Sequence, residues 1–341
     1  MSKLLSIIIP VYNVEKYVEK CIRSCEIQNV DRDSYEIIII NDGSKDNSLS
    51  IISQLANEYN NIKVFSRENR GLSATRNEGI NKSSGEYLMF IDSDDWIEEN
   101  ILDNIYHKLK NDNPDVMAMS ASVIRNNQAV TIKKYGNDNK MSKHNFIRKY
   151  GIIHCVPFYI WRKQYLIENS LMFLEGIYHE DAEFTPRALY NTTGISVFEH
   201  NFYYVRENPD SITRTANSKR SFDLLNYVCT SLLTFTNKHV ENIDKYIYYN
   251  EISICFNNAF AYLCGSDKKT IREFEKQIFL KKELIECLKK STKRKYKIEY
   301  YLFKLFPHST YKIYRILQFF NPNQTIKKTI KKTIKKDKSL N

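Results

Sequence analysis

The chain has 341 residues, of which 42% are hydrophobic and 27% charged, and this balance is typical of a globular protein with a sizeable core. A formal net charge of +11 and a pI near 9.1 indicate an anionic partner, such as nucleic acid, anionic lipid or a phosphorylated substrate. Seven scattered cysteines with no C-x-x-C pair argue against a disulfide framework and indicate reduced thiols in the cytosol.

The first elements alternate between strand and helix. Residues 4–10 read L-L-S-I-I-I-P, which predicts a buried strand ended by proline. Residues 14–25 carry apolar side chains at helical spacing, and Asn13 can cap that helix. Residues 35–40 include four consecutive isoleucines, and such continuous apolar character predicts a central parallel strand covered on both faces.

The same alternation continues to residue 91. We expect a helix over about 46–59, a strand over 62–66, a helix over 71–83 and a buried strand over 87–91. Short connections between alternating strands and helices require right-handed crossovers and a parallel sheet. Ligands bind such sheets beyond the carboxyl ends of the strands, so that edge is where function is expected.

Carboxylates cluster directly after the fourth strand, in the sequence I-D-S-D-D-W. Asp92, Asp94 and Asp95 fall within four positions, and like charges so close together are costly unless a partner neutralises them. Mg²⁺ and Mn²⁺ accept carboxylate and phosphate oxygens, so this D-x-D predicts a site for a metal-bound diphosphate. The alternative is that Asp94 or Asp95 caps a helix beginning near Ile97, with the remaining carboxylates solvated.

Two other strand ends add side chains to the same edge. Pro10 and Tyr12 end the first strand, and the Tyr12 ring can stack on a base. Asp42 follows the second strand and can accept a hydrogen bond from a base or ribose, although a plain turn is an equal alternative. The chain lacks G-x-G-x-x-G after its first strand and lacks G-x-x-x-x-G-K-[ST], which disfavours dinucleotide oxidoreductases and P-loop ATPases.

Four motifs in one order carry a resemblance to a known family. They read S-I-I-I-P-V-Y-N, I-I-I-I-N-D-G-S-K-D-N-S, R-E-N-R-G-L-S-A-T-R-N-E-G-I and Y-L-M-F-I-D-S-D-D-W. Over residues 6–96 the chain resembles the family 2 glycosyltransferases of the GT-A type. The resemblance implies an α/β fold with a Rossmann-like, mostly parallel sheet flanked by helices. It also implies a nucleotide-sugar donor, with UDP the expected nucleotide, and inversion at the anomeric carbon.

The resemblance assigns roles to residues at the strand ends. The residues expected to contact the nucleotide-sugar are Pro10, Tyr12, Asp42, Arg76, Asp92, Ser93 and Asp95. Asp94 would ligate the divalent metal, Mn²⁺ or Mg²⁺. An arginine at position 76 can neutralise a diphosphate, or it can brace the edge of the sheet, and both readings stay open.

A second acidic motif supplies a candidate base, because the acceptor hydroxyl must lose its proton as it attacks the sugar. The segment I-Y-H-E-D-A-E-F over 177–184 overlaps a helix expected over 181–189. Its Glu180-Asp181 pair resembles the family's second acidic motif, which assigns Asp181 as the base with Glu180 or His179 in support. The alternative is an acidic helix N-terminus, which is favourable to the helix dipole.

The chain between and after these motifs is less informative. We expect a strand over 115–124, a polar loop or hairpin over 125–143 and a strand over 198–206. Arg206 can approach the diphosphate, and His200 fits a surface histidine better than a metal ligand.

The character of the chain changes after about residue 215. Residues 216–322 are rich in Tyr, Phe and Lys, helical in pattern and without a chemical motif, and the tail over 323–341 repeats T-I-K-K three times. Basic residues around isoleucines at four-residue spacing are typical of an interfacial helix, although a solvated, disordered tail is the alternative. We therefore expect a catalytic domain over 1–215, a helical region and a tail that binds an anionic membrane surface.

Two functional hypotheses remain. The first is an inverting, metal-dependent glycosyltransferase of the hexosyl or N-acetylhexosaminyl type, cytoplasmic and peripheral on the inner membrane face. It would transfer to a hydroxyl of a saccharide or lipid-linked oligosaccharide in surface polysaccharide biosynthesis. The second is a non-catalytic nucleotide-sugar- or membrane-binding protein on the same scaffold; having both Asp94 and Asp181 favours the enzyme. No RNA-binding motif appears, so we expect no nucleic-acid partner.

Overall fold

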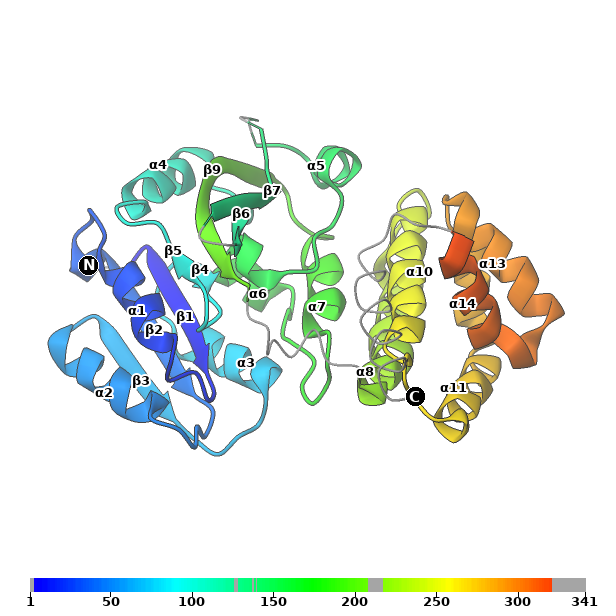
Figure 1. Ribbon diagram of the computed structural model, residues 1–341. Helices are drawn as coiled ribbons and strands as arrows, with labels where there is room; N and C mark the ends of the chain where they lie inside the picture. Colours follow the sequence, from blue (N-terminus) through cyan, green and yellow to red (C-terminus); the bar gives the residue numbers. More distant parts are fainter. Residues whose placement is uncertain (1–2, 126–127, 137, 139, 208–216, 321–341) are drawn as a thin grey trace. The chain divides into compact units, whose positions relative to one another are not determined.

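The computed structural model describes residues 3–125, 128–136, 138, 140–207 and 217–320 (Figure 1). The chain divides into two compact units, each with its own hydrophobic core. The first unit comprises Met1–Gly176 and Arg187–Asn208, and the second comprises Ile177–Pro186 and Pro209–Asn341. Helix α7 (Glu180–Ala188) therefore begins in the second unit and ends in the first.

The first unit opens with four parallel strands, as the sequence predicts. They lie in the order β3-β2-β1-β4, where the strands are β1 (Leu5–Val11), β2 (Tyr35–Asn41), β3 (Ile62–Ser66) and β4 (Tyr87–Phe90). Every residue of β1, β2 and β4 is buried, which explains why these strands are continuous apolar runs and not alternating ones. The expected parallel sheet is confirmed.

Three helices connect these strands, namely α1 (Val18–Glu26), α2 (Ser48–Glu58) and α3 (Leu72–Lys82). Helix α3 packs against β1 and β2, and α1 packs against α2. At Gly79 of α3, an added Cβ would lie 2.3 Å from Cγ2 of Ile8. Only glycine allows the helix to approach the sheet this closely.

The rest of the first unit extends the sheet with mixed strand directions. The elements are β5 (Trp96–Ile97), α4 (Leu102–Asp112), β6 (Val116–Arg125), β7 (Gln128–Lys133), α5 (Lys143–Tyr150), β8 (Tyr159–Arg162), α6 (Lys163–Glu168) and β9 (Ile195–Arg206). The sheet continues as β4-β8-β6-β9-β5, with β7 paired to β6 as a hairpin. Strand β5 pairs with β9 and the next helix begins only at Leu102, so the alternative of a helix near Ile97 capped by Asp94 or Asp95 is wrong.

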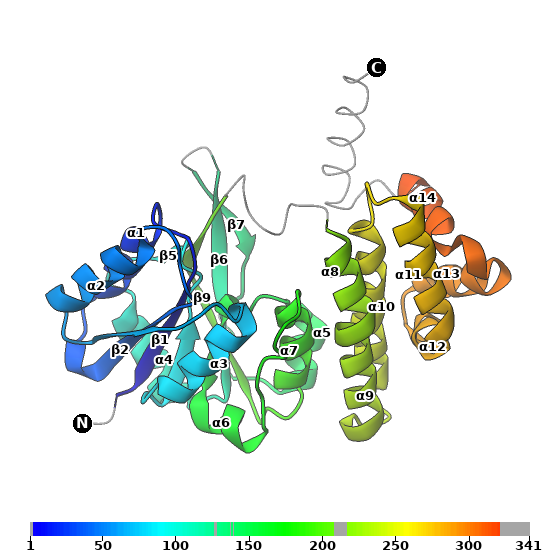
Figure 2. The same cartoon turned by 90° about the horizontal axis from the view of Figure 1, so that it is seen from below.

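The second unit is helical in its described residues, as expected. After the first part of α7 come α8 (Ser218–Asp223), α9 (Cys229–His239), α10 (Lys245–Ala261), α11 (Lys268–Leu280), α12 (Lys282–Lys290), α13 (Arg294–Leu305) and α14 (Thr310–Phe320). A π-helical segment joins α8 to α9, so the two form one continuous rod alongside α10 (Figure 2). Phe260 lies at the centre of the core, where its ring stacks on Tyr314 at 5.0 Å. None of the described helices combines the length and the apolar character needed to cross a bilayer.

A buried carboxylate joins the amino ends of the parallel strands. Glu36 on β2 accepts hydrogen bonds from Ser6 on β1 at 2.7 Å, from Lys63 on β3 at 2.7 Å and from the Ser84 hydroxyl, just before β4, at 2.8 Å. Burial alone raises the pKa of Glu36, but the hydrogen bonds from Lys63, Ser6 and Ser84 outweigh it and lower the pKa to about 2. The carboxylate therefore stabilises the fold only while it is ionised.

We predict that Glu36→Gln lowers the free energy of unfolding by about 2–3 kcal/mol at neutral pH. Because the folded pKa lies below the unfolded one, this contribution is complete above about pH 4.5 and is lost as the pH falls towards 2. Urea unfolding of wild type and variant across this range measures it, with the exposed Glu99→Gln as control. A difference between wild type and Glu36→Gln that did not shrink at low pH would contradict the assignment.

Candidate active site

The carboxyl ends of β2, β1 and β4 lie side by side. Val11 is paired with Asn41, and the N–H of Asp42 donates to the carbonyl of Val11 at 2.9 Å. On the other side of β1, the N–H of Ile91 donates to the carbonyl of Ile8 at 3.0 Å. The residues that follow these strands, including Tyr12, Asp42 and Asp92, therefore start from neighbouring positions at one edge of the sheet.

Asp42 is held by the loop that follows β3. Its Oδ1 accepts from the Arg67 Nε and the Arg70 N–H, both at 3.0 Å, and its Oδ2 accepts from the Gly71 N–H at 2.7 Å. Only 3% of Asp42 is exposed, whereas the Tyr12 ring is 46% exposed and open to stacking. Asp42 thus fixes the loop that leads into α3, and its reading of a base stays a prediction.

Arg76 braces the first aspartate of the cluster. Its guanidinium is 1% exposed, lies over the Phe173 ring at 5.5 Å and donates from Nη2 to Oδ1 of Asp92 at 3.0 Å. Ser93, the next residue, is buried, and so is Pro10. Arg76 therefore contacts Asp92, and its role towards a diphosphate stays a prediction.

Asp95 is the most enclosed of the three carboxylates. Its Oδ2 accepts from the Tyr203 hydroxyl at 2.9 Å, and its Oδ1 accepts from the Arg206 N–H at 2.8 Å. The Tyr203 hydroxyl in turn accepts from the Asp92 N–H at 3.2 Å. Burial, and then the charges of Asp92 and Asp94, raise the pKa of Asp95 above its usual range. A cation beside these carboxylates would relieve that repulsion.

Asp94 differs from its neighbours in how its carboxylate is used. Its backbone carbonyl accepts from the Arg206 Nε at 3.0 Å, but its half-buried carboxylate accepts no hydrogen bond from any residue that the structure describes. Within the described ranges, no three His, Cys, Asp or Glu side chains are grouped to hold a metal ion by themselves. The donor set at Asp94 therefore fits a Mg²⁺ or Mn²⁺ ion that takes its other ligands from phosphate oxygens and water.

Two cations, Arg206 and Lys20, lie beside this cluster. The sequence did not predict the aromatic rings that hold them there. The Arg206 guanidinium sits 4.8 Å from the Tyr17 ring and 4.9 Å from the Trp96 ring, and Lys20 Nζ is 3.4 Å from the Trp96 centroid. Burial and the Arg206 charge lower the pKa of Lys20. The sequence carried no signal for Tyr203 either, because it lies 108 positions from Asp95 and comes near it through the pairing of β5 with β9.

The second acidic motif belongs to the other compact unit. Glu180 and Asp181 occupy the first turn of α7 and are partly exposed. Nearby, Glu183 is 2% exposed and accepts from the Ser231 hydroxyl at 2.6 Å, and the His179 ring lies 4.9 Å from the Tyr262 ring. Glu183 therefore has a structural role, while the roles of Asp181 as base and Glu180 as support stay predictions.

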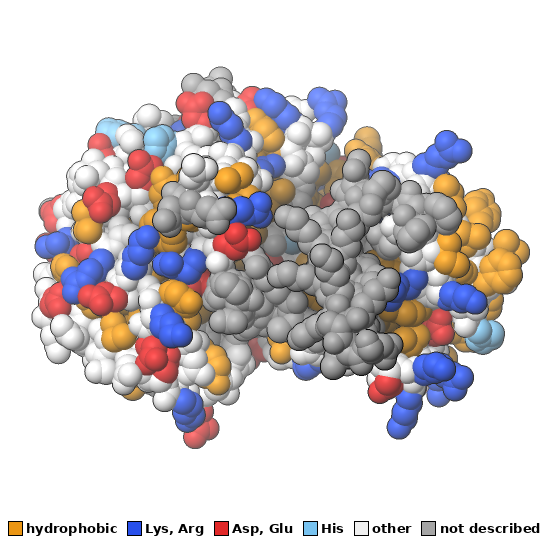
Figure 3. Space-filling model, in the orientation of Figure 1, with side chains coloured by type: hydrophobic (Ala, Val, Ile, Leu, Met, Phe, Trp, Pro, Cys, Tyr) orange, Lys and Arg blue, Asp and Glu red, His pale blue; other side chains and the backbone are white. Residues whose placement is uncertain are grey.

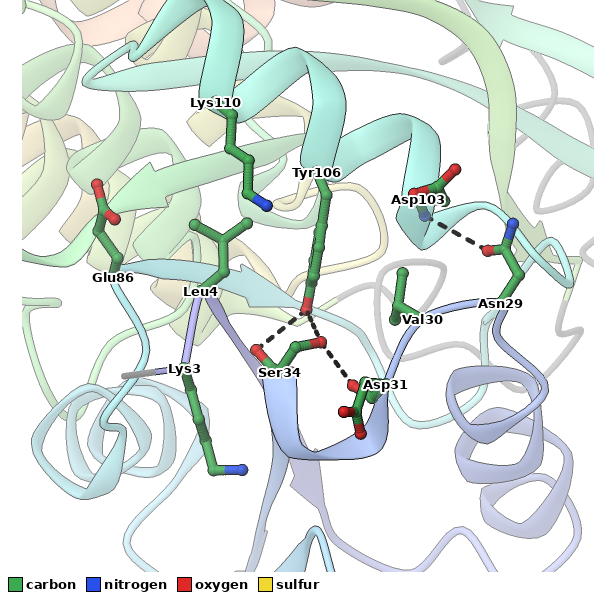
Figure 4. A pocket seen from close by; sticks show the side chains of 10 residues that line it. All are labelled: Lys3, Leu4, Asn29, Val30, Asp31, Ser34, Glu86, Asp103, Tyr106 and Lys110. Carbon is green, nitrogen blue, oxygen red and sulfur yellow. Dashed lines mark hydrogen bonds between the residues drawn. The ribbon is translucent and has the colours of Figure 1, made fainter. Parts of the chain in front are cut away.

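A pocket of about 470 Å³ lies away from the aspartates (Figure 4). Its lining includes Lys3, Ser34 and Glu86, which precede β1, β2 and β4, so it opens at the amino ends of the parallel strands. Within it, the Ser34 hydroxyl donates a hydrogen bond to the Tyr106 hydroxyl at 3.2 Å. Since ligands of parallel sheets bind at the opposite edge, this pocket is not assigned to the candidate active site.

Comparison with known sequences identifies a family. Residues 6–171 match the sequence model described as Glycosyl transferase family 2. The chain is 28% identical to "Uncharacterized glycosyltransferase EpsJ" of Bacillus subtilis (strain 168), over 76% of this chain and 79% of that protein. It is 30% identical to "Minor teichoic acid biosynthesis protein GgaA" of the same organism, over 84% of this chain and 66% of that protein.

Solved structures share the fold. S. aureus TarS 1-349 in complex with UDP-GlcNAc aligns with a TM-score of 0.72 and 20% identity, over 91% of this chain and 90% of that one. A more distant neighbour is the mannosyltransferase PcManGT from Pyrobaculum calidifontis in complex with GDP-Man and Mn²⁺. It has a TM-score of 0.53 and 12% identity over 95% of this chain and 89% of that one. The expected GT-A type of fold, followed by a helical region, is confirmed.

We predict that Tyr203→Phe destabilises the first unit by about 1–3 kcal/mol, because buried Asp95 loses one of its two hydrogen-bond donors and the Asp92 N–H loses its acceptor. Tyr204→Phe is the matched control, since no residue in the described ranges bonds to the Tyr204 hydroxyl. Urea unfolding of both variants measures the effect. Equal stabilities for the two variants would show that the Tyr203 hydroxyl does not hold the cluster.

Proposed function

The chain belongs, through residues 6–171, to the family 2 glycosyltransferases, and from this premise we propose that it transfers a sugar with inversion from a UDP-sugar. The acceptor would be a hydroxyl of a saccharide or lipid-linked oligosaccharide in the synthesis of a surface polysaccharide. The observation that carries the proposal is the strand edge where Tyr12 and Asp94 follow neighbouring strands. There the Tyr12 ring is exposed, and the Asp94 carboxylate accepts no hydrogen bond from the described part of the chain.

Two relatives support the choice of donor and acceptor. The structural neighbour TarS was solved with UDP-GlcNAc, which favours UDP as the nucleotide. The relative GgaA is named for minor teichoic acid biosynthesis, which favours a cell-surface polymer as the acceptor class. For this chain, a hexosyl or N-acetylhexosaminyl donor and a saccharide or lipid-linked acceptor are the corresponding proposals.

The proposed donor site follows from the strand ends. Pro10 and Tyr12 would line the base pocket, with the Tyr12 ring stacked on the base, and Asp42 would accept a hydrogen bond from the base. Asp92 and Ser93 would lie near the ribose, and Asp95 near the donor sugar. Asp94 would hold Mn²⁺ or Mg²⁺, which when bound supplies positive charge to the departing diphosphate.

The proposed acceptor chemistry uses the second acidic motif. Asp181 would accept the proton of the attacking hydroxyl, so that the oxygen forms its bond to the anomeric carbon as the bond to the diphosphate breaks. Attack opposite the leaving group gives inversion. Glu180 would support Asp181, and Arg206 would add positive charge beside the diphosphate.

We keep the domain bounds and the membrane location that the sequence predicts. A catalytic domain over 1–215, a helical region over 216–322 and a tail over 323–341 remain our proposal, and the tail lies outside the described residues. We propose that its lysines bind the anionic inner face of the cell membrane, where lipid-linked acceptors are presented. Each lysine near such a surface contributes roughly 1 kcal/mol.

Asp94→Ala is expected to abolish metal-dependent UDP binding while leaving the fold intact. The partly exposed Asp103→Ala is the control, because it removes a carboxylate from α4. Calorimetric titration of UDP with Mn²⁺, and again with a chelator, measures the effect. Metal-dependent binding that survives in Asp94→Ala would remove Asp94 from the site.

Asp181→Asn is expected to bind UDP-sugar normally but to lose transfer by about 10²–10⁴-fold, because the base is gone and the donor site is untouched. Glu180→Gln, the change at the neighbouring residue, is expected to reduce transfer by a smaller factor. UDP release from UDP-sugar with a panel of saccharide acceptors measures turnover. Normal turnover in Asp181→Asn would refute the base, and a wild-type chain that binds donor without turnover on any acceptor would favour the non-catalytic alternative.

A further inference from the structure

Helix α13 presents apolar side chains on two opposite faces. Tyr296, Tyr300 and Phe303 are 1–3% exposed and belong to the core of the second unit. On the opposite face, Ile298, Tyr301 and Leu305 are 45%, 59% and 69% exposed. The buried face packs the helix into the core. The exposed apolar side chains of the opposite face have no role in that packing.

The exposed side chains form one continuous stripe. Ile298, Tyr301 and Leu305 are spaced three and four positions apart, so they fall on the same side of the helix. Phe306, the next residue, is 56% exposed and extends the stripe beyond the helix end. These four residues are called the α13 face below.

The apolar surface continues from the α13 face to the end of α11. His308, two residues after Phe306, stacks on the Phe279 ring at 5.9 Å. Phe279 is 42% exposed, and Leu280 beside it is 72% exposed. Figure 3 shows hydrophobic side chains gathered where α13 lies in Figure 1, with Lys and Arg side chains beside them. The patch is therefore broader than one helix.

The segment that carries the α13 face is strongly basic. Residues 281–318 contain eleven Lys and Arg but only three Asp and Glu, a formal excess of eight positive charges. Glu299, one of the three acids, is 4% exposed and faces the core. Lys297 and Lys304, seven positions apart on one edge of the stripe, form no ion pair with any residue in the described ranges. These charges are available to an anionic partner.

We propose that the α13 face docks on an anionic lipid bilayer, with the apolar stripe in the headgroup region and Lys297 and Lys304 against lipid phosphates. This rests on the proposed function, since it adds a folded contact to the membrane location proposed there for the tail. Aliphatic Ile298 and Leu305 suit the acyl boundary. A strand of RNA would instead need a charged groove that follows its backbone, whereas the α13 face is the exposed side of a single helix.

The test uses the full chain and sedimentation with two kinds of vesicle, phosphatidylglycerol mixed with phosphatidylcholine, and phosphatidylcholine alone. The apolar variant is Tyr301→Ser with Leu305→Ser, and its matched control is Tyr246→Ser with Ile243→Ser, an equally exposed pair elsewhere in the unit. The charge variant is Lys297→Glu with Lys304→Glu, and its matched control is Lys110→Glu with Lys238→Glu. All four pairs are exposed, so folding should be unaffected, and UDP binding is measured on every sample.

We expect wild type to bind only the anionic vesicles, and each α13 variant to weaken that affinity at least about tenfold while both controls bind normally. UDP binding should be unchanged throughout. This pattern would support a bilayer as the occupant of the α13 face.

Three results would overturn the inference. Normal vesicle binding by the α13 variants, with loss only when Lys327, Lys328, Lys331 and Lys332 are changed to Gln, would assign the membrane to the tail alone. Loss of self-association, or of RNA binding, in place of vesicle binding would assign the face to a second copy or to nucleic acid. No vesicle binding by wild type would remove the membrane contact, and intact UDP binding in that sample would leave the transferase proposal standing.

Discussion

The structure depends on placing three carboxylates at the end of a buried strand. Asp92, Asp94 and Asp95 follow β4, whose residues are all buried, and water cannot screen them fully there. Hydrogen-bond donors from other elements offset this repulsion at two of the three carboxylates. Arg76 neutralises Asp92 from α3, and the end of β9 supplies the Tyr203 hydroxyl and the Arg206 N–H to Asp95. Asp94 alone keeps a carboxylate that no described residue bonds.

This constraint explains why distant segments meet at the same edge. Strand β5 exists as two residues that pair with β9, and this pairing brings Tyr203 and Arg206 to the aspartates. On the other side of β1, Asp42 organises the loop into α3, the helix that carries Arg76. The donors that hold Asp42, Asp92 and Asp95 are thus accounted for, and Asp94 is the carboxylate that we propose for the metal-bound diphosphate.

The parallel half of the sheet was predictable because each of its signals is local. Continuous apolar runs ended by Pro10, Asp42 and Asp92 predict buried strands and the edge where their ends meet, and the structure agrees. The partners of these residues were not predictable, since Tyr203 reaches Asp95 through strand pairing across 108 positions. The supposed helix near Ile97 failed for the same reason, because β5 forms only through its pairing with β9. The pattern at Asp181 is compatible with two roles, because an acidic first turn also suits a helix N-terminus.

The measurement that tests the central claim most directly is a thermal-shift screen of the full chain with UDP-, GDP- and dTDP-sugars, each with and without Mn²⁺. The account predicts a raised melting temperature with UDP-sugar only when Mn²⁺ is present. A ligand at ~100 times its dissociation constant stabilises by about 2.7 kcal/mol, which such a screen detects. An equal shift without metal, or no shift with any donor, would contradict a metal-bound diphosphate at the strand-end aspartates.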